Sequence, residues 1–128
     1  MPTIFEKIIA REIPSYTIYE DAAHIVILDI GPIHPGQVLV IPKSPIDYVF
    51  DMDDQHYTQL LLLAKKVATH MKKVLKVQRI GMVLEGLEVP HVHVKLIPID
   101  HGHPIDPKYI SKLTHEDAVG LQKLLKMQ

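Results

Sequence analysis

The 128-residue sequence contains no cysteine, which excludes a disulfide framework, a thiolate zinc site and a cysteine nucleophile. It also lacks an excess of charge of either sign, because 14 Lys and Arg residues stand against 15 Asp and Glu residues. The formal net charge of −1 argues against a broad basic surface for nucleic acid or an anionic membrane. No apolar run approaches the roughly 20 residues of a membrane span. Charged residues interrupt the N-terminal apolar stretch, so we expect no signal peptide.

The chain does contain enough apolar material for one packed core. Hydrophobic residues make up 47% of the sequence, which argues against disorder. The length suits one domain, and the sequence has no repeat, low-complexity tract or linker. We therefore expect a single domain over residues 1–128, in a cytoplasmic protein that binds neither nucleic acid nor membrane.

The pattern of apolar residues predicts an α+β fold. Two nearly continuous apolar segments, 24–28 and 37–42, are typical of central strands covered on both faces. Apolar residues at steps of three and four predict a long helix from Asp54 to about Lys76. Leu62 and Leu63 widen this apolar stripe, which favours a homodimer contact. Further strands are expected at 16–19, 79–84 and 89–97, and short helices at 4–12 and 115–126. This order predicts an antiparallel sheet of about five strands with one long helix and short terminal helices.

The segment 89–97 carries the most chemical information. Side chains alternate between the two faces of a strand, so polar and apolar residues would separate here. The polar face would hold His91, His93 and Lys95, and the core face Val92, Val94 and Leu96. Two imidazoles and an ammonium suit phosphate chemistry, because a neutral imidazole is a competent nucleophile near pH 7. Spacing alone leaves two alternatives, a solvent-facing strand and a metal pair, although a neighbouring ammonium disfavours a bound cation.

The segment His91-Val92-His93-Val94-Lys95-Leu96-Ile97 resembles the histidine triad (HIT) motif, in which histidines alternate with hydrophobic residues. Other stretches are similar to the Hint-like bacterial branch of this family and occur in the expected order. They are 3–14, 19–21, 28–30, 35–43, 80–82 and 86–91, so the resemblance covers roughly residues 3 to 100. The resemblance implies a HIT-like fold, usually a homodimer, that binds a purine nucleotide; we expect no cofactor.

The resemblance also implies an activity. Family members act at the α-phosphate of nucleoside phosphoramidates, adenylates or dinucleoside polyphosphates, with an AMP-like nucleotide as substrate or product. The middle motif histidine attacks phosphorus and forms a nucleotidyl-histidine intermediate, which water hydrolyses. His93 matches that nucleophile, and His91 and Lys95 occupy the flanking motif positions. By position, the nucleotide-binding residues would be Ile4, Phe5, Ile8, Ile27, Asp29, Ile30, Gln37 and Leu39.

The sequence departs from the family pattern at two positions close to the nucleophile. Lys95 replaces the third motif histidine, and Gln37 replaces a histidine common in the family. Lysine can neutralise a phosphate oxygen but does not easily exchange a proton near pH 7, and glutamine cannot titrate. The alternative is therefore a nucleotide-binding HIT protein with weak or no catalytic activity. A metal-binding protein that uses His91 and His93 is a second rival.

A structural zinc site is not expected. Many bacterial members of the Hint branch bind zinc through two cysteines and a histidine, and these positions hold Thr3, Glu6 and Pro45 here. A second His-x-His pair, His101 and His103, lies in a loop rich in Gly and Pro. It is interpreted as a solvated loop, with a metal site and a contact to a leaving group as alternatives.

Glu88 precedes the histidine segment and leaves one question open. The period of two places it on the opposite face from His91 in a regular strand. A bend at Pro90 would allow its carboxylate to face the site, where it would repel phosphate.

Overall fold

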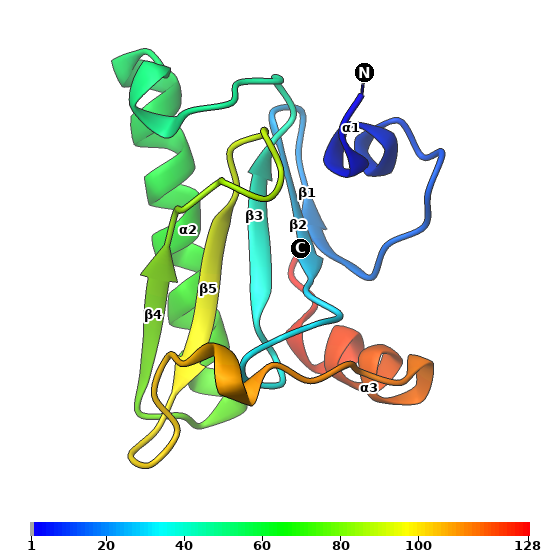
Figure 1. Ribbon diagram of the computed structural model, residues 1–128, viewed down its shortest axis with the longest axis vertical. Helices are drawn as coiled ribbons and strands as arrows, with labels where there is room; N and C mark the ends of the chain where they lie inside the picture. The colour runs from blue at the N-terminus through cyan, green and yellow to red at the C-terminus, as the bar shows by residue number, and fades with distance from the viewer. Residues whose placement is uncertain (1) are drawn as a thin grey trace.

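The computed structural model describes residues 2–128 and contains a five-stranded antiparallel sheet with the strand order β1-β2-β3-β5-β4 (Figure 1). The strands are β1 (Thr17–Glu20), β2 (His24–Leu28), β3 (Val38–Pro42), β4 (Arg79–Val83) and β5 (Val94–Ile99). The helices are α1 (Ile4–Ile9), α2 (Asp54–Leu75) and α3 (His115–Leu125), with short 3-10 turns η1 (Val49–Asp51) and η2 (Pro107–Tyr109). The predicted α+β class, with one long helix and short terminal helices, is confirmed. Within residues 2–128, no helix is long and apolar enough to cross a membrane.

The two faces of the sheet have different cores. On one face, α2 packs against β3, β4 and β5, and α3 packs against β1 and β2; α2 buries Leu60, Ala64, Val67 and Met71. Side chains alternate along β2 and β3, so their intervening residues point to the other face. There, Phe5 and Ile8 of α1 pack with Ile25, Ile27, Leu39 and Ile41. Because both faces are covered, β2 and β3 are buried along their whole length, as their continuous apolar sequences predict.

Helix α1 ends earlier than the sequence predicts. The expected end near Glu12 relied on Pro14, but the helix ends at Ile9 because Arg11 adopts a left-handed conformation with φ of 62°. The Glu12 N–H donates to the Lys7 carbonyl at 2.9 Å, and the Arg11 N–H donates to the Ile8 carbonyl at 3.0 Å. These two bonds form the Schellman motif that commonly terminates a helix. The Arg11 guanidinium also binds Glu20 of β1, which ties α1 to the sheet.

The predicted strand over 89–97 is wrong at its beginning, because β5 starts only at Val94. Pro90 has no N–H for a strand ladder, and the His91 N–H donates to the Val89 carbonyl at 2.8 Å. The Val92 N–H donates instead to the Ile46 carbonyl, at 2.7 Å, in the segment before α2. The side chains nevertheless keep the predicted faces, with Val92, Val94 and Leu96 in the core beneath α2.

Gly36 generates a testable prediction about the turn before β3. Its φ is 99°, and a Cβ at this position would lie 2.8 Å from Cδ1 of Leu75. Gly36→Ala should therefore destabilise the fold by more than about 1 kcal/mol in urea unfolding. Gly120→Ala is the matched control, because Gly120 lies within α3 and a Cβ there would have no described atom within 4 Å outside its chain neighbours and the helix backbone. Alanine should stabilise that helix by about 0.5–1 kcal/mol. Equal stability of Gly36→Ala and the wild type would contradict the prediction.

Candidate functional site

A pocket of about 320 Å³ lies on the face of the sheet opposite α2, between α1 and the cross-strand neighbours Ile27, Leu39 and Lys95 of β2, β3 and β5. It gathers seven of the residues that the sequence proposes for nucleotide binding: Ile4, Phe5, Ile8, Ile27, Asp29, Ile30 and Leu39. His93 and Lys95 also line it, whereas His91 and Gln37 do not. The sequence did not single out six further lining residues, Ile13, Pro14, Ser15, Tyr16, Leu28 and Val89. Most of these lie in the irregular segment after α1, whose return to the pocket depends on contacts distant in sequence.

The His93 ring is held in one tautomer. Only 6% of His93 is exposed, and its Nδ1 lies 2.8 Å from the His91 carbonyl oxygen. A carbonyl can only accept a hydrogen bond, so Nδ1 carries the proton and Nε2 of the neutral ring has the lone pair. The Phe5 ring packs edge-on against the imidazole, with ring centroids 4.8 Å apart. The ring is thus fixed in position, and its Nε2 forms no hydrogen bond within the described part of the chain.

The surroundings of His93 favour its neutral form. Burial lowers the pKa of the imidazole, because a charged ring loses solvation there. The Lys95 ammonium and the His91 ring lower the pKa further, while the His91 carbonyl and the Asp29 carboxylate act in the opposite direction. The net result is a pKa below the ordinary histidine value of 6.5. The lone pair on Nε2 is therefore available at neutral pH.

His91 lies behind His93 and is completely buried. Its Nε2 lies 2.7 Å from the Pro42 carbonyl oxygen, so Nε2–H is the donor. Its Nδ1 is buried and has no hydrogen-bond partner among residues 2–128. His91 thus contacts His93 through its backbone carbonyl, while its ring anchors the same stretch of chain to the end of β3.

The Gln37 side chain bonds to Asp29 and to the Ile33 backbone. Its side chain is 2% exposed, and its amide nitrogen donates to Oδ2 of Asp29 at 2.8 Å. Its amide oxygen accepts the Ile33 N–H at 3.0 Å, and the Gly31 N–H donates to the second Asp29 oxygen at 2.9 Å. The loop between β2 and β3 is therefore bonded internally, with the Asp29 carboxylate held at the edge of the pocket.

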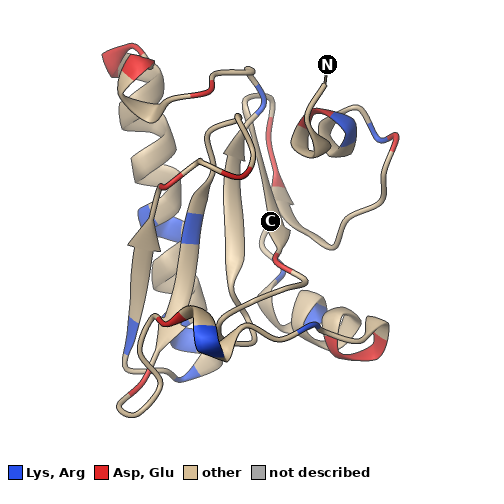
Figure 2. Cartoon of the chain, viewed as in Figure 1, with Lys and Arg blue, Asp and Glu red and all other residues tan. Residues whose placement is uncertain are grey.

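Acidic residues line both hollows that His93 borders. His93 also lines a smaller hollow of about 20 Å³, together with Asp47, Tyr48 and Glu85. Glu88 lines the larger pocket, so the bend before β5 does bring this residue to the site. Figure 2 shows acidic segments on both loops at this end of the sheet. The bend at Pro90 left this position open for Glu88, whereas no sequence pattern connects Asp47 or Glu85 with the site, because isolated acidic residues in turns are normally solvated.

Metal ligation has little support in the described residues. Thr3 and Glu6, which occupy zinc-ligand positions of the family, bond to each other in a capping box at the start of α1, with both bonds 3.1 Å long. Pro45 has no side-chain donor atom. Residues 2–128 contain no group of three or more His, Cys, Asp or Glu side chains that could hold a metal ion. The residues at these positions therefore do not fit a structural zinc ion.

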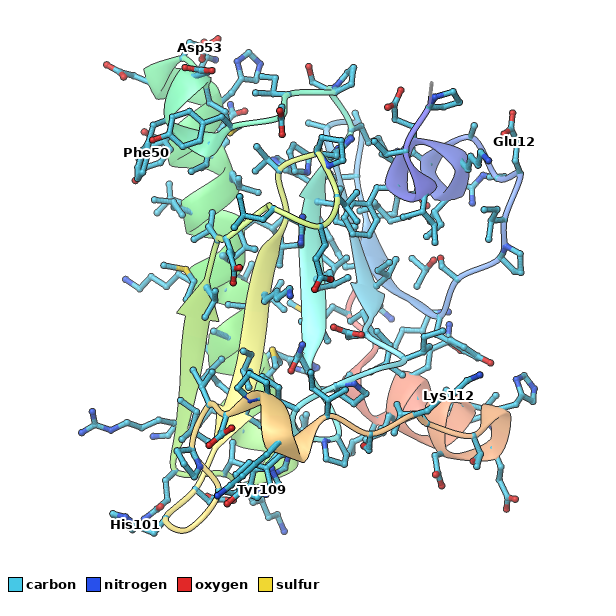
Figure 3. All side chains as sticks on the ribbon, viewed as in Figure 1. Glu12, Phe50, Asp53, His101, Tyr109 and Lys112 are labelled. Carbon is cyan, nitrogen blue, oxygen red and sulfur yellow. The ribbon has the colours of Figure 1, made fainter. Side chains whose placement is uncertain are left out.

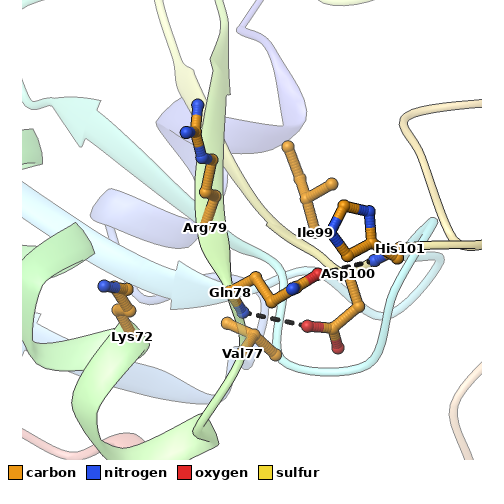
Figure 4. A pocket seen from close by; sticks show the side chains of 7 residues that line it. All are labelled: Lys72, Val77, Gln78, Arg79, Ile99, Asp100 and His101. Carbon is orange, nitrogen blue, oxygen red and sulfur yellow. Dashed lines mark hydrogen bonds between the residues drawn. The ribbon is translucent and has the colours of Figure 1, made fainter.

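The second His-x-His pair is divided between two environments. His101 is exposed at the outer end of the loop after β5, where it borders an open hollow with Lys72, Arg79 and Asp100 (Figures 3 and 4). In that hollow, Gln78 bonds both to Asp100 and to the His101 N–H. Nε2 of His103 instead donates to the Ile33 carbonyl at 2.9 Å. Neither histidine lines the pocket that contains His93.

The influence of Lys95 on His93 is testable by NMR titration. Lys95→Met should raise the pKa of the His93 imidazole toward its ordinary value, because it removes a nearby positive charge that opposes protonation. Lys112→Met is the matched control, since Lys112 is exposed on the segment before α3 (Figure 3). The same His93 pKa in the wild type and Lys95→Met would contradict this account.

Comparison with known proteins assigns the family. Residues 10–102 match the HIT domain. The chain is 33% identical over 120 residues to the purine nucleoside phosphoramidase of Escherichia coli strain K12, covering 86% of this chain and 95% of that protein. It is 38% identical over 96 residues to adenosine 5′-monophosphoramidase of Saccharomyces cerevisiae, covering 74% of this chain and 61% of the yeast protein. Among solved structures, a Hit-like protein involved in cell-cycle regulation from Bartonella henselae matches with a TM-score of 0.85 and 29% identity, covering 97% and 94% of the two chains. The chain therefore belongs to the histidine triad family.

Proposed function

We propose that this protein is a nucleotide hydrolase or nucleotidyl transferase that attacks the α-phosphate of purine nucleoside phosphoramidates, adenylates or dinucleoside polyphosphates. The observation that carries this proposal is the fixed His93 ring, whose Nε2 forms no hydrogen bond with any of residues 2–128 and which lines a pocket large enough for a ligand. The phosphoramidase names of the Escherichia coli and yeast relatives support the reaction class.

The larger pocket suits a nucleoside. Aliphatic side chains and the Phe5 ring form apolar walls that can hold a purine base. Asp29 contributes a carboxylate at the same pocket, and a carboxylate can accept hydrogen bonds from both ribose hydroxyls. A base between the apolar walls and a ribose at Asp29 would direct the 5′-phosphate toward His93 and Lys95. An AMP-like nucleotide is therefore the proposed substrate or product.

The proposed reaction has two displacements at phosphorus. In the first, the Nε2 lone pair forms a bond to phosphorus, and the bond to the leaving group breaks with its electron pair going to that group. The phosphorylated ring keeps its Nδ1 proton, which the His91 carbonyl accepts. In the second, water attacks phosphorus and loses a proton to solvent, and the electron pair of the N–P bond returns to Nε2. Lys95 would stabilise the phosphate oxygens as a positive charge in both steps.

A binding protein without turnover is the second candidate. Two observations favour it: Lys95 stands where the family has a titratable histidine, and Gln37 is directed to Asp29. Neither change removes the nucleophile or the pocket, because His93 and the apolar walls do not depend on them for their own contacts. The two candidates therefore differ in turnover and share nucleotide binding.

Turnover is tested with adenosine 5′-phosphoramidate and its release of AMP. The wild type should release AMP, and His93→Ala should lose about 10³-fold or more of kcat/KM, because the nucleophile is gone. His101→Ala is the matched control, since His101 lies outside the pocket, and should keep the wild-type rate. As pH falls, kcat/KM should decline only below 6.5, since the pKa of His93 is lowered and the unprotonated ring attacks.

The outcomes separate the rival functions. AMP binding by calorimetry without AMP release would favour the binding protein. Release that persists in His93→Ala would contradict the proposed nucleophile. Stoichiometric metal in the purified wild type, lost in a His91→Ala/His93→Ala double variant, would favour the metal-binding protein.

We also propose that the protein forms a homodimer through the edge strand β4. Strand β4 is at the edge of the sheet, where unpaired backbone groups can accept another strand. Met82 on this strand is 52% exposed, so the free edge presents a large apolar side chain to a partner. Leu62 on α2 is 61% exposed but lies beside the turn between β1 and β2, at the other side of the sheet. Light scattering should give twice the 14.5 kDa chain mass. Met82→Lys should weaken association, whereas a monomeric wild type would contradict the proposal.

A further inference from the structure

We infer that the outer side of His93 selects amine leaving groups that carry a positive charge, so that the preferred substrates are nucleoside phosphoramidates of diamines or basic amino compounds. This inference rests on the proposed function and names its substrate class. It is carried by three carboxylates, those of Asp47, Glu85 and Glu88, which line the two hollows that His93 borders.

The three carboxylates lie on two loops that meet beside His93. The Val92 N–H donates to the Ile46 carbonyl at 2.7 Å, which joins the segment before α2 to the segment before β5. Gly86 lies against the same segment, since a Cβ on it would be 4.0 Å from the Asp47 carbonyl oxygen. The loops thus form one rim. Within residues 2–128, none of the three carboxylates has a salt-bridge partner, and all three residues are exposed.

The position of this rim identifies it as the leaving-group side. A nucleoside in the larger pocket would occupy the space between α1 and the strands, with phosphorus at Nε2 of His93. The smaller hollow that His93 also lines has room for about one water molecule, and its charged residues are Asp47 and Glu85, so a leaving group would pass over these residues at the surface. Glu88 is exposed at the larger pocket. A leaving group that extends to solvent from either of the two hollows therefore passes near an acidic residue.

The charges discriminate between leaving groups. When the P–N bond of a phosphoramidate breaks, its electron pair stays on the leaving nitrogen, which takes up one proton from solvent and departs as an amine. A second, positively charged group on that amine is attracted by the three carboxylates. A leaving diphosphate or nucleotide brings several negative charges to the same place and is repelled. Lys95 lies in the larger pocket, where it can neutralise the phosphate oxygens instead.

Three adenosine 5′-phosphoramidates of matched length test the inference. Their amines are 1,3-diaminopropane, propylamine and 3-aminopropanoate, which leave a cationic, a neutral and an anionic group beyond the scissile bond. In the wild type, kcat/KM should be highest for the cationic substrate and about tenfold or more lower for the anionic one at low salt. The difference should shrink as ionic strength rises, because exposed charges are screened.

Charge-removing variants locate the effect. Asp47→Asn/Glu85→Gln and Glu88→Gln should each reduce the ratio of cationic to anionic kcat/KM, and the triple variant should bring it within about twofold. Glu12→Gln is the matched control: it removes one charge from the exposed segment after α1, outside the pocket, and should leave the ratio unchanged (Figure 3). Because ratios within one variant are compared, a general loss of folding or activity does not mimic the effect.

The outcomes distinguish this inference from the proposed function. Equal kcat/KM for the three substrates in the wild type overturns the inference and leaves the phosphoramidase proposal intact. A cationic preference that persists in the triple variant also overturns it, because the carboxylates would not be its cause. Failure of the wild type to release AMP from any of the three overturns both.

Discussion

The hydrogen bond from Nδ1 of His93 to the His91 carbonyl is the interaction on which the proposed chemistry depends. It assigns the proton to one ring nitrogen and leaves the other with a lone pair at the pocket. The carbonyl can accept this bond because the chain does not yet follow strand geometry there: the His91 ring is anchored to Pro42, and the Val92 N–H is bound to Ile46. The irregular backbone of residues 91–93 thus determines the orientation of the His93 ring, the proposed nucleophile.

Local sequence patterns predict the regular elements well. The apolar segment 24–28 matches β2 residue for residue, and the apolar stripe places α2 within one residue at its C-terminal end. These elements are buried along one or both faces, so their hydrophobic pattern contains the information that determines them. The beginning of β5 and the end of α1 depend instead on the Ile46 carbonyl and on the left-handed Arg11. Such bonds join residues far apart in sequence or require an unusual φ, and neither leaves a periodic signal.

The same distinction applies to the candidate site. The alternation of polar and apolar residues correctly separates Val92 and Val94 from His93 and Lys95, even though the strand begins later than expected. The resemblance to the family brings together the apolar residues at the pocket, whose roles remain predictions. Neither source indicated the contact between Gln37 and Asp29, and the sequence left the position of Glu88 open because it depends on the bend at Pro90. Both arise from loop conformations that sequence spacing does not determine.

The bonding of Gln37 has a consequence for ligand recognition. Its amide joins Asp29 to the Ile33 backbone, and Gly31 holds the other carboxylate oxygen, so this side chain has little rotational freedom before any ligand arrives. An acceptor that is already immobilised loses little conformational entropy when a sugar hydroxyl binds to it. Gln37, which departs from the family pattern, thus preorganises the Asp29 carboxylate for the proposed ligand. Because the glutamine amide does not titrate, this hydrogen bonding should not change with pH through residue 37.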